Sequence, residues 1–206
     1  MSGELFLPRH YTRLSALLSI LESGALALAD PAKWTDRNDF ASVEAFRRGK
    51  GVKGLGVLCF AFGPESSHHW ARYAEGDGCC IMFDGGRLLE RIAASGLLHG
   101  EVRYYSVEDL TAAKLRAMGV DALPFIKRRP YECESEYRVV WAGERTGKGP
   151  VLDVGGCIDC VTLSADFNPH AAGAVERLLN ERYKTKTKRS RLLASDQWIS
   201  KFKNLK

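Results

Sequence analysis

The sequence lacks the signals that would place a chain in or across a membrane. No stretch approaches the ~20 consecutive apolar residues that span a bilayer. The opening, MSGELFLP, has neither a basic segment nor a long apolar core, so we expect no secretory signal peptide. The expected location is the cytoplasm.

Motifs of several common enzyme classes are also missing. The chain has no Gly-rich phosphate loop, no Walker sequence, no His-Glu-x-x-His and no Gly-x-Ser-x-Gly. It has no internal repeat and no low-complexity block. These absences argue against P-loop nucleotide hydrolases, zincin proteases and α/β-hydrolases.

Metal-binding cysteine patterns are missing as well. Cys157 and Cys160 form a CxxC, but a structural zinc needs four ligands, and the only candidate partners are the adjacent Cys79 and Cys80. No helix is expected after the CxxC, which argues against a thioredoxin-like redox role. With no export signal, we expect six free thiols and no metal.

The composition is that of an ordinary globular protein. The chain has 206 residues, of which 45% are hydrophobic, enough for one domain with a real core. The net charge of +5 is unevenly spread, because the segment from Lys184 onward has eight basic residues and one acid. We therefore predict a domain over 1–183 and a basic extension over 184–206. A final strand near Leu192 and Leu193 is an alternative for part of that extension.

Hydrophobic patterns predict a mixed α+β fold. A helix follows Thr12, a candidate cap, because leucines recur at three-and-four spacing up to Gly24. Apolar runs over 57–62 and 79–83 predict buried strands. Residues 34–39 are expected to form a polar loop, and 107–129 to be helical with breaks at Gly119 and Pro124. Strands and helices alternate without a regular β-α-β order, which favours α+β over a doubly wound sheet.

The segment Arg9-His10-Tyr11-Thr12 is the first candidate site. It is expected at the end of a strand that leads into a helix, where ligand sites are frequent because side chains and helix N–H groups converge. His10 and Thr12 can both hold sugar hydroxyls. The alternative is a partly buried histidine beside a helix cap.

Three glutamates form the second candidate site. Period-two spacing places Glu132, Glu134 and Glu136 on one side of a strand that continues through Arg138. Like charges so close should raise one pKa unless cations intervene. The alternative is an exposed strand edge in which Arg138 pairs with a neighbour.

Two further segments carry aromatic or basic side chains. On a helix, Trp70 and Tyr73 share a face and could stack on a flat ring, although such aromatics are more often core. In the tail, a segment with five basic residues and no acidic residue could contact phosphates. The alternative is an ordinary solvent-exposed surface segment. These cations are Lys184, Lys186, Lys188, Arg189 and Arg191.

The order of these segments resembles the bacterial domain-of-unknown-function family 2971. The matching stretches are HYTRLSALLSILESGALALAD, Trp34 with Asn38-Asp39, Leu58-Cys59-Phe60, WARYAEGDGCCIMFD and Glu134-Ser135-Glu136-Tyr137-Arg138. They cover most of residues 5–142. Arg72 stands where the family usually has histidine, and the Asn-Asp pair lacks the proline that commonly follows it.

The opening also resembles DarT-type ADP-ribosyltransferases, which begin with a strand ending in His-x-Thr and use a late strand entered by Glu-x-Glu. This resemblance implies a split, largely antiparallel sheet flanked by helices, with NAD as substrate and no metal. Glu136 would stabilise charge on the NAD ribose, and Glu134 would activate the acceptor. The implied NAD-binding residues are His10, Tyr11, Thr12, Asn38, Trp70 and Tyr73. Such enzymes often serve in toxin or phage-defence systems.

Two other interpretations stay open. The basic tail is compatible with a non-enzymatic nucleic-acid-binding module. The unusual Arg72 and Asn-Asp region are compatible with a degenerate relative that binds a nucleotide without turnover. The acceptor of an active enzyme could be nucleic acid or protein.

Overall fold

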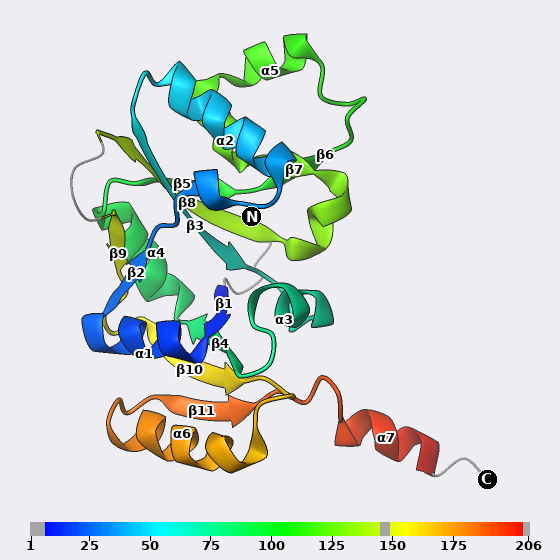
Figure 1. Ribbon diagram of the computed structural model, residues 1–206. Helices are drawn as coiled ribbons and strands as arrows, with labels where there is room; N and C mark the ends of the chain where they lie inside the picture. The colour runs from blue at the N-terminus through cyan, green and yellow to red at the C-terminus, as the bar shows by residue number, and fades with distance from the viewer. Residues whose placement is uncertain (1–6, 145–148, 204–206) are drawn as a thin grey trace.

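A computed structural model describes residues 7–144 and 149–203, and it has a mostly antiparallel sheet combined with helices (Figure 1). This confirms the mixed α+β class. The strands are β1 (Arg9–Arg13), β2 (Ala25–Ala27), β3 (Gly54–Ala61), β4 (Gly78–Phe83), β5 (Leu98–Glu101), β6 (Arg103–Tyr105), β7 (Ile126–Arg128), β8 (Glu136–Gly143), β9 (Val151–Asp153), β10 (Ile158–Leu163) and β11 (Lys186–Arg189). The α-helices are α1 (Leu14–Ser23), α2 (Arg37–Gly49), α3 (Ser67–Tyr73), α4 (Gly85–Ala94), α5 (Ala112–Met118), α6 (Pro169–Glu181) and α7 (Asp196–Lys203). Three 3₁₀ segments are η1 (Pro31–Lys33), η2 (Val120–Phe125) and η3 (Arg129–Glu134).

The main sheet has the strand order β11-β10-β4-β1-β3-β8-β5. All its neighbours are antiparallel except β10 and β11. The first strand of the chain therefore lies in the middle of the sheet. It pairs with β4 along its whole length, but with β3 only where Arg9 faces Ala61. The sheet is consequently open between β1 and β3.

The apolar patterns of the sequence fill the core as expected. Helix α1 buries Leu17 completely, and Gly24 ends the helix at φ 66°, donating its N–H to the Ile20 carbonyl. A left-handed residue at this place suits glycine, which has no Cβ to clash. Strands β3 and β4 supply buried Phe60, Ile81 and Phe83 to the same core. These contacts hold the two central strands beside β1.

Several predicted elements need correction. Thr12 lies within β1 and is no helix cap, because α1 begins only at Leu14 after Arg13. The loop predicted over 34–39 contains the start of α2, which Asp36 caps by accepting from two backbone N–H groups. The start of the first predicted strand, before Leu7, lies outside the described residues.

Two longer predictions are also wrong in detail. In the segment 107–129, Gly119 ends α5 and Pro124 lies within η2, at the two expected breaks, but Ile126–Arg128 forms strand β7 where a helix was predicted. The tail strand is β11, several residues before Leu192 and Leu193, which are both exposed. Helix α7 then extends away from the body (Figure 1). No helix among the described residues is long and apolar enough to span a bilayer.

Candidate functional site

The opening between β1 and β3 leads into a cavity of about 510 Å³. This size is within the range of about 300–1,000 Å³ typical of small-molecule sites. Its walls come from the first three residues of β1, the part of β3 from Val57 to Ala61, the segment around η1, helix α3, and the β7–β8 region. Five consecutive β3 residues line the cavity, because this edge of β3 is unpaired between Val57, which bridges to Ala29, and Ala61, which faces Arg9.

His10 crosses the gap between the two strands. Its Nδ1–H donates to the Cys59 carbonyl of β3 at 3.2 Å, which takes the place of a missing strand-to-strand hydrogen bond. A carbonyl can only accept, so this contact assigns the proton to Nδ1. Burial lowers the pKa of His10, although the bond to Cys59 opposes the shift. His10 is therefore a neutral imidazole at neutral pH, and it lines the cavity.

On the other side of the gap, Glu136 and Glu134 meet at Lys127. The Lys127 Nζ lies 2.5 Å from Glu136 Oε1 and 2.6 Å from Glu134 Oε2. All three side chains are buried, with 6% exposure for Lys127, 1% for Glu134 and 7% for Glu136. Buried charges need such partners, because an isolated charge in a low-dielectric interior is costly.

Arg138 completes this buried charge cluster and is itself fully buried. Its guanidinium forms a two-pronged pair with Asp39 of α2, with N–O distances of 2.8 and 2.7 Å. Arg138 also contacts Glu136 through a single carboxylate oxygen, Oε2. Its Nε–H donates to this oxygen at 2.7 Å, and its Nη2 lies 2.6 Å from it. Three acids and two cations thus form a network that joins α2, β7 and β8.

The two glutamates titrate in opposite directions. Burial alone would raise the pKa of Glu136, but the charges of Arg138 and Lys127 outweigh it and hold this pKa well below its usual value. Burial and the neighbouring Glu136 raise the pKa of Glu134, despite Lys127. This is the splitting expected of two close carboxylates, with the cations acting mainly on one of them. Glu136 is therefore the permanent anion of the pair.

The local backbone differs from the predicted strand of three aligned glutamates. Strand β8 begins only at Glu136, and the preceding residues form η3. Ser135 adopts a left-handed conformation at φ 43°, so the chain turns sharply between the two buried glutamates. Glu132 is exposed and stands apart from them. The alternative of an exposed strand edge is also wrong, because β8 lies between β3 and β5.

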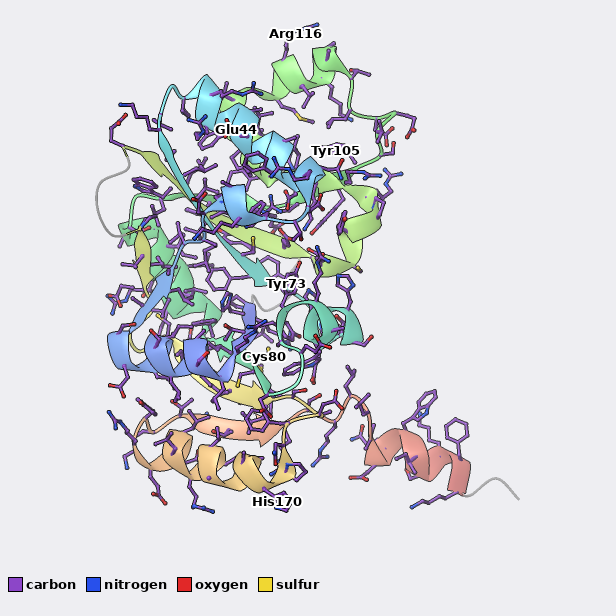
Figure 2. The ribbon with its side chains drawn as sticks, in the orientation of Figure 1. Glu44, Tyr73, Cys80, Tyr105, Arg116 and His170 are labelled. Carbon is purple, nitrogen blue, oxygen red and sulfur yellow. The ribbon has the colours of Figure 1, made fainter. Side chains whose placement is uncertain are left out.

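Helix α3 supplies a third wall. The Tyr73 hydroxyl donates to Glu134 Oε2 at 3.0 Å, and its ring lines the cavity. Figure 2 labels Tyr73 between α3 and the end of β3. His69 is buried, stacks on Tyr11 at 4.9 Å, and donates from Nε2 to the backbone carbonyl of Glu134 at 3.1 Å. Helix α3 therefore fixes both the main chain and the side chain of Glu134.

The structure brings together five of the eight catalytic and NAD-binding residues predicted from the sequence. His10, Tyr11, Tyr73, Glu134 and Glu136 all line the same cavity.

The other three lie elsewhere. Thr12 pairs with Cys79 on β4 and is not among the residues that line the cavity. Trp70 packs in the core against Tyr11 and donates to Glu65. Asn38 is exposed and bonds to Asp36, while its neighbour Asp39 points inward.

Sequence reasoning missed Lys127 and gave no individual role to Arg9 or Trp34, although all three line the cavity. Lys127 gave no signal, because it lies in a stretch whose pattern is that of an amphipathic helix. Arg138 had a signal: a cation between valines and a tyrosine on a strand is unusual unless it is paired inside the core. No group of three or more potential ligands among the described residues is placed to hold a metal ion.

The basic tail is partly engaged by the body. Arg189 pairs with Glu176 of α6 at 2.8 Å, and Lys186 lies 3.5 Å from Asp159. Lys184, Lys188 and Arg191 have no ion pair with any described residue. Beyond them, Trp198 and Phe202 are 63% and 55% exposed on α7, with ring centroids 5.2 Å apart.

Comparison with known proteins adds no assignment. No protein-family model matches the chain, and no curated protein is significantly similar to it. The resemblance to family 2971 and to DarT-type enzymes therefore stays a prediction from the motifs.

Proposed function

We propose that the chain is an ADP-ribosyltransferase-like protein that cleaves NAD in the cavity between β1 and β3. The observation that carries the proposal is the common cavity of His10, Tyr73 and Glu136, which lie far apart in the sequence. The cavity combines a neutral imidazole, an aromatic ring and a carboxylate that stays ionised. Those are the groups to which the resemblance to DarT-type enzymes assigns NAD binding and cleavage.

The reaction places positive charge on the ribose as nicotinamide leaves, as in glycosidic cleavage. A fixed anion at that point lowers the barrier, and such preorganised electrostatic contacts are worth about 3–4 kcal/mol each. Both oxygens of Glu136 already accept hydrogen bonds. Lys127 uses only one of the two lone-pair positions of Oε1, which leaves the other for a ribose hydroxyl. His10 would hold the second sugar hydroxyl, and Tyr73 would stack on the nicotinamide.

The test is release of nicotinamide from NAD by the full chain. We expect Glu136→Gln to lower the rate by about 10²–10³-fold. His170→Gln is the matched control, because His170 is exposed on α6 and lies outside the cavity (Figure 2). The proposal is wrong if the Gln variant, folded by circular dichroism, releases nicotinamide as fast as the unmodified protein.

A second candidate is nucleotide binding without turnover. The specific observation in its favour is that Glu136 is bound by Lys127 and Arg138 together, which offsets part of its negative charge. Calorimetry with NAD separates the two candidates. Heat of binding with no nicotinamide in the mixture would favour the binding protein, and binding together with product would favour the enzyme.

The acceptor that we propose is nucleic acid, engaged through the tail. Exposed Trp198 and Phe202 could stack on bases while the unpaired cations contact phosphates. Labelled NAD followed by digestion tests this: label removed by nuclease supports it, and label removed only by protease refutes it.

A tail truncation separates this enzyme from a binding module without activity. It should begin after Ser190, because a cut at Lys184 would delete β11 from the sheet. Loss of nucleic-acid binding in the truncated chain, with no NAD activity in either form, would favour the module.

A further inference from the structure

Glu134 lies between the cavity and a second titratable group that faces solvent. Its Oε2 accepts from the Tyr73 hydroxyl at 3.0 Å, and its Oε1 lies 3.2 Å from His68 Nε2. Glu134 is 1% exposed, whereas His68 is 40% exposed and Tyr73 41% exposed. The buried carboxyl therefore reaches solvent only through its partners.

Tyr73 and His68, the two residues at the ends of this chain of contacts, face different surroundings. Tyr73 lines the cavity, and His68 is not among the lining residues. Lys127, the other side-chain partner of Glu134, is nearly as buried and is bound to three carboxylates, so it is a poor proton donor to solvent. Its pKa is raised, because those carboxylates outweigh the opposing effect of burial. His68 is therefore the partner of Glu134 that meets solvent outside the cavity.

We infer that Tyr73, Glu134 and His68 form a proton path that carries the acceptor's proton from the cavity to solvent. The inference rests on the proposed function, and it assigns His68 a role in the transfer step. His68 contacts neither NAD nor the acceptor on this account. It is a positioning and proton-exchange residue that acts through Glu134.

The acceptor X–H forms a bond to the ribose C1′, while the C1′–N bond breaks and its electron pair leaves with neutral nicotinamide. The proton of X–H moves to the Tyr73 oxygen as the Tyr73 proton moves to Glu134 Oε2. The proton on Glu134 Oε1 passes to His68 Nε2, and His68 releases its Nδ1 proton to water. The starting state returns when the carboxyl proton moves from Oε2 to Oε1 and when His68 loses its Nε2 proton to water and regains one on Nδ1 from water.

Several charged and titratable groups surround this path. His69, Arg72 and Tyr73 face it from α3, Lys127 from β7, and Glu136 from β8, with Asp39 of α2 reached through Lys127. His69 cannot replace His68, because its two ring nitrogens contact Ser66 and the Glu134 backbone. Glu134 can hold a proton, because burial and Glu136 raise its pKa.

The kinetic test compares three variants of the full chain at saturating NAD. We expect His68→Ala to lower transfer to the acceptor at least about 10-fold, and added imidazole to restore it in a concentration-dependent way. Tyr73→Phe should be slow and should not respond to imidazole, because it breaks the path at the cavity end. His170→Gln should behave like the unmodified chain. An unchanged rate in His68→Ala, or a loss that imidazole leaves untouched, overturns the path.

A second measurement does not depend on turnover. A pH-difference infrared spectrum should contain a protonated-carboxyl band that Glu134→Gln removes. His68→Ala should shift that band, and His170→Gln should not. An unshifted band in His68→Ala overturns the pairing of His68 with Glu134. A shifted band in a protein that releases no nicotinamide supports the pair but overturns its assignment to ADP-ribosyl transfer.

Discussion

Replacing Arg138 by Met is the most direct test of the buried charge cluster. Arg138 is fully buried and is the two-pronged partner of Asp39 as well as a partner of Glu136. The substitution keeps much of the side-chain volume but leaves three acids facing Lys127 alone. Removing one partner of a buried ion pair costs about 3–5 kcal/mol. For a chain of this length that corresponds to a fall in Tm of roughly 6–20 °C.

The cost should depend on pH in a defined direction. Arg138 and Lys127 depress the pKa of Glu136 in the folded state, so this contribution to stability is present above the ordinary carboxyl value of about 4.3. It is lost as pH falls from there through the depressed value, because the unfolded chain binds protons first. The variant lacks most of this contribution. The difference in stability between the two proteins should therefore shrink on acidification below about pH 4.

Urea unfolding followed by circular dichroism measures both effects. Arg87→Met is the control, because it removes an exposed arginine whose pairing with Asp84 at 3.7 Å is worth about 0–1 kcal/mol. The double variant Asp39→Asn, Arg138→Met should cost less than the sum of the single variants by about 0.5–3 kcal/mol, since the residues share one interaction. A cost below about 1 kcal/mol for Arg138→Met, or strict additivity, would refute the reasoning.

Three further predictions concern single positions. Gly78→Ala should destabilise strongly in thermal melts, because its Cβ would lie 1.9 Å from the Ala74 carbonyl oxygen, whereas Gly149→Ala, with open space, should have little effect. Ser66→Ala should cost about 1 kcal/mol in urea unfolding, since Ser66 caps α3, and a cost near zero would contradict that role. Trp198→Ala with Phe202→Ala should leave Tm unchanged, because both rings are exposed; a large drop would show that α7 packs on the body.

The helices and strands that depend on the local spacing of apolar residues could be predicted from the sequence. Helix α1, its glycine end and strands β3 and β4 follow from apolar spacing and from the left-handed preference of glycine. His10 and Glu136 could be selected because residue types at strand ends carry chemical meaning, and both line the cavity.

What failed depends on long-range contacts. Lys127 is paired with carboxylates whose proximity cannot be predicted from the local hydrophobic pattern. Trp70 packs in the hydrophobic core and does not line the cavity. The turn at Ser135 also escaped prediction, because a serine at φ 43° is held by its surroundings and not by its own preference. Asn38 was selected in place of Asp39, since only the helical phase of α2 decides which of the two points inward.

The central position of β1 has a consequence for how the chain reaches its native state. This strand is synthesised before both of its neighbours, β3 and β4, which emerge only after α1 and α2. Until then its backbone N–H and C=O groups must be satisfied by water. Pairings between such distant segments slow folding, since the entropy of closing a long loop is lost before any contact forms. Amide hydrogen exchange at β1 should report the opening of the part of the sheet that encloses the cavity.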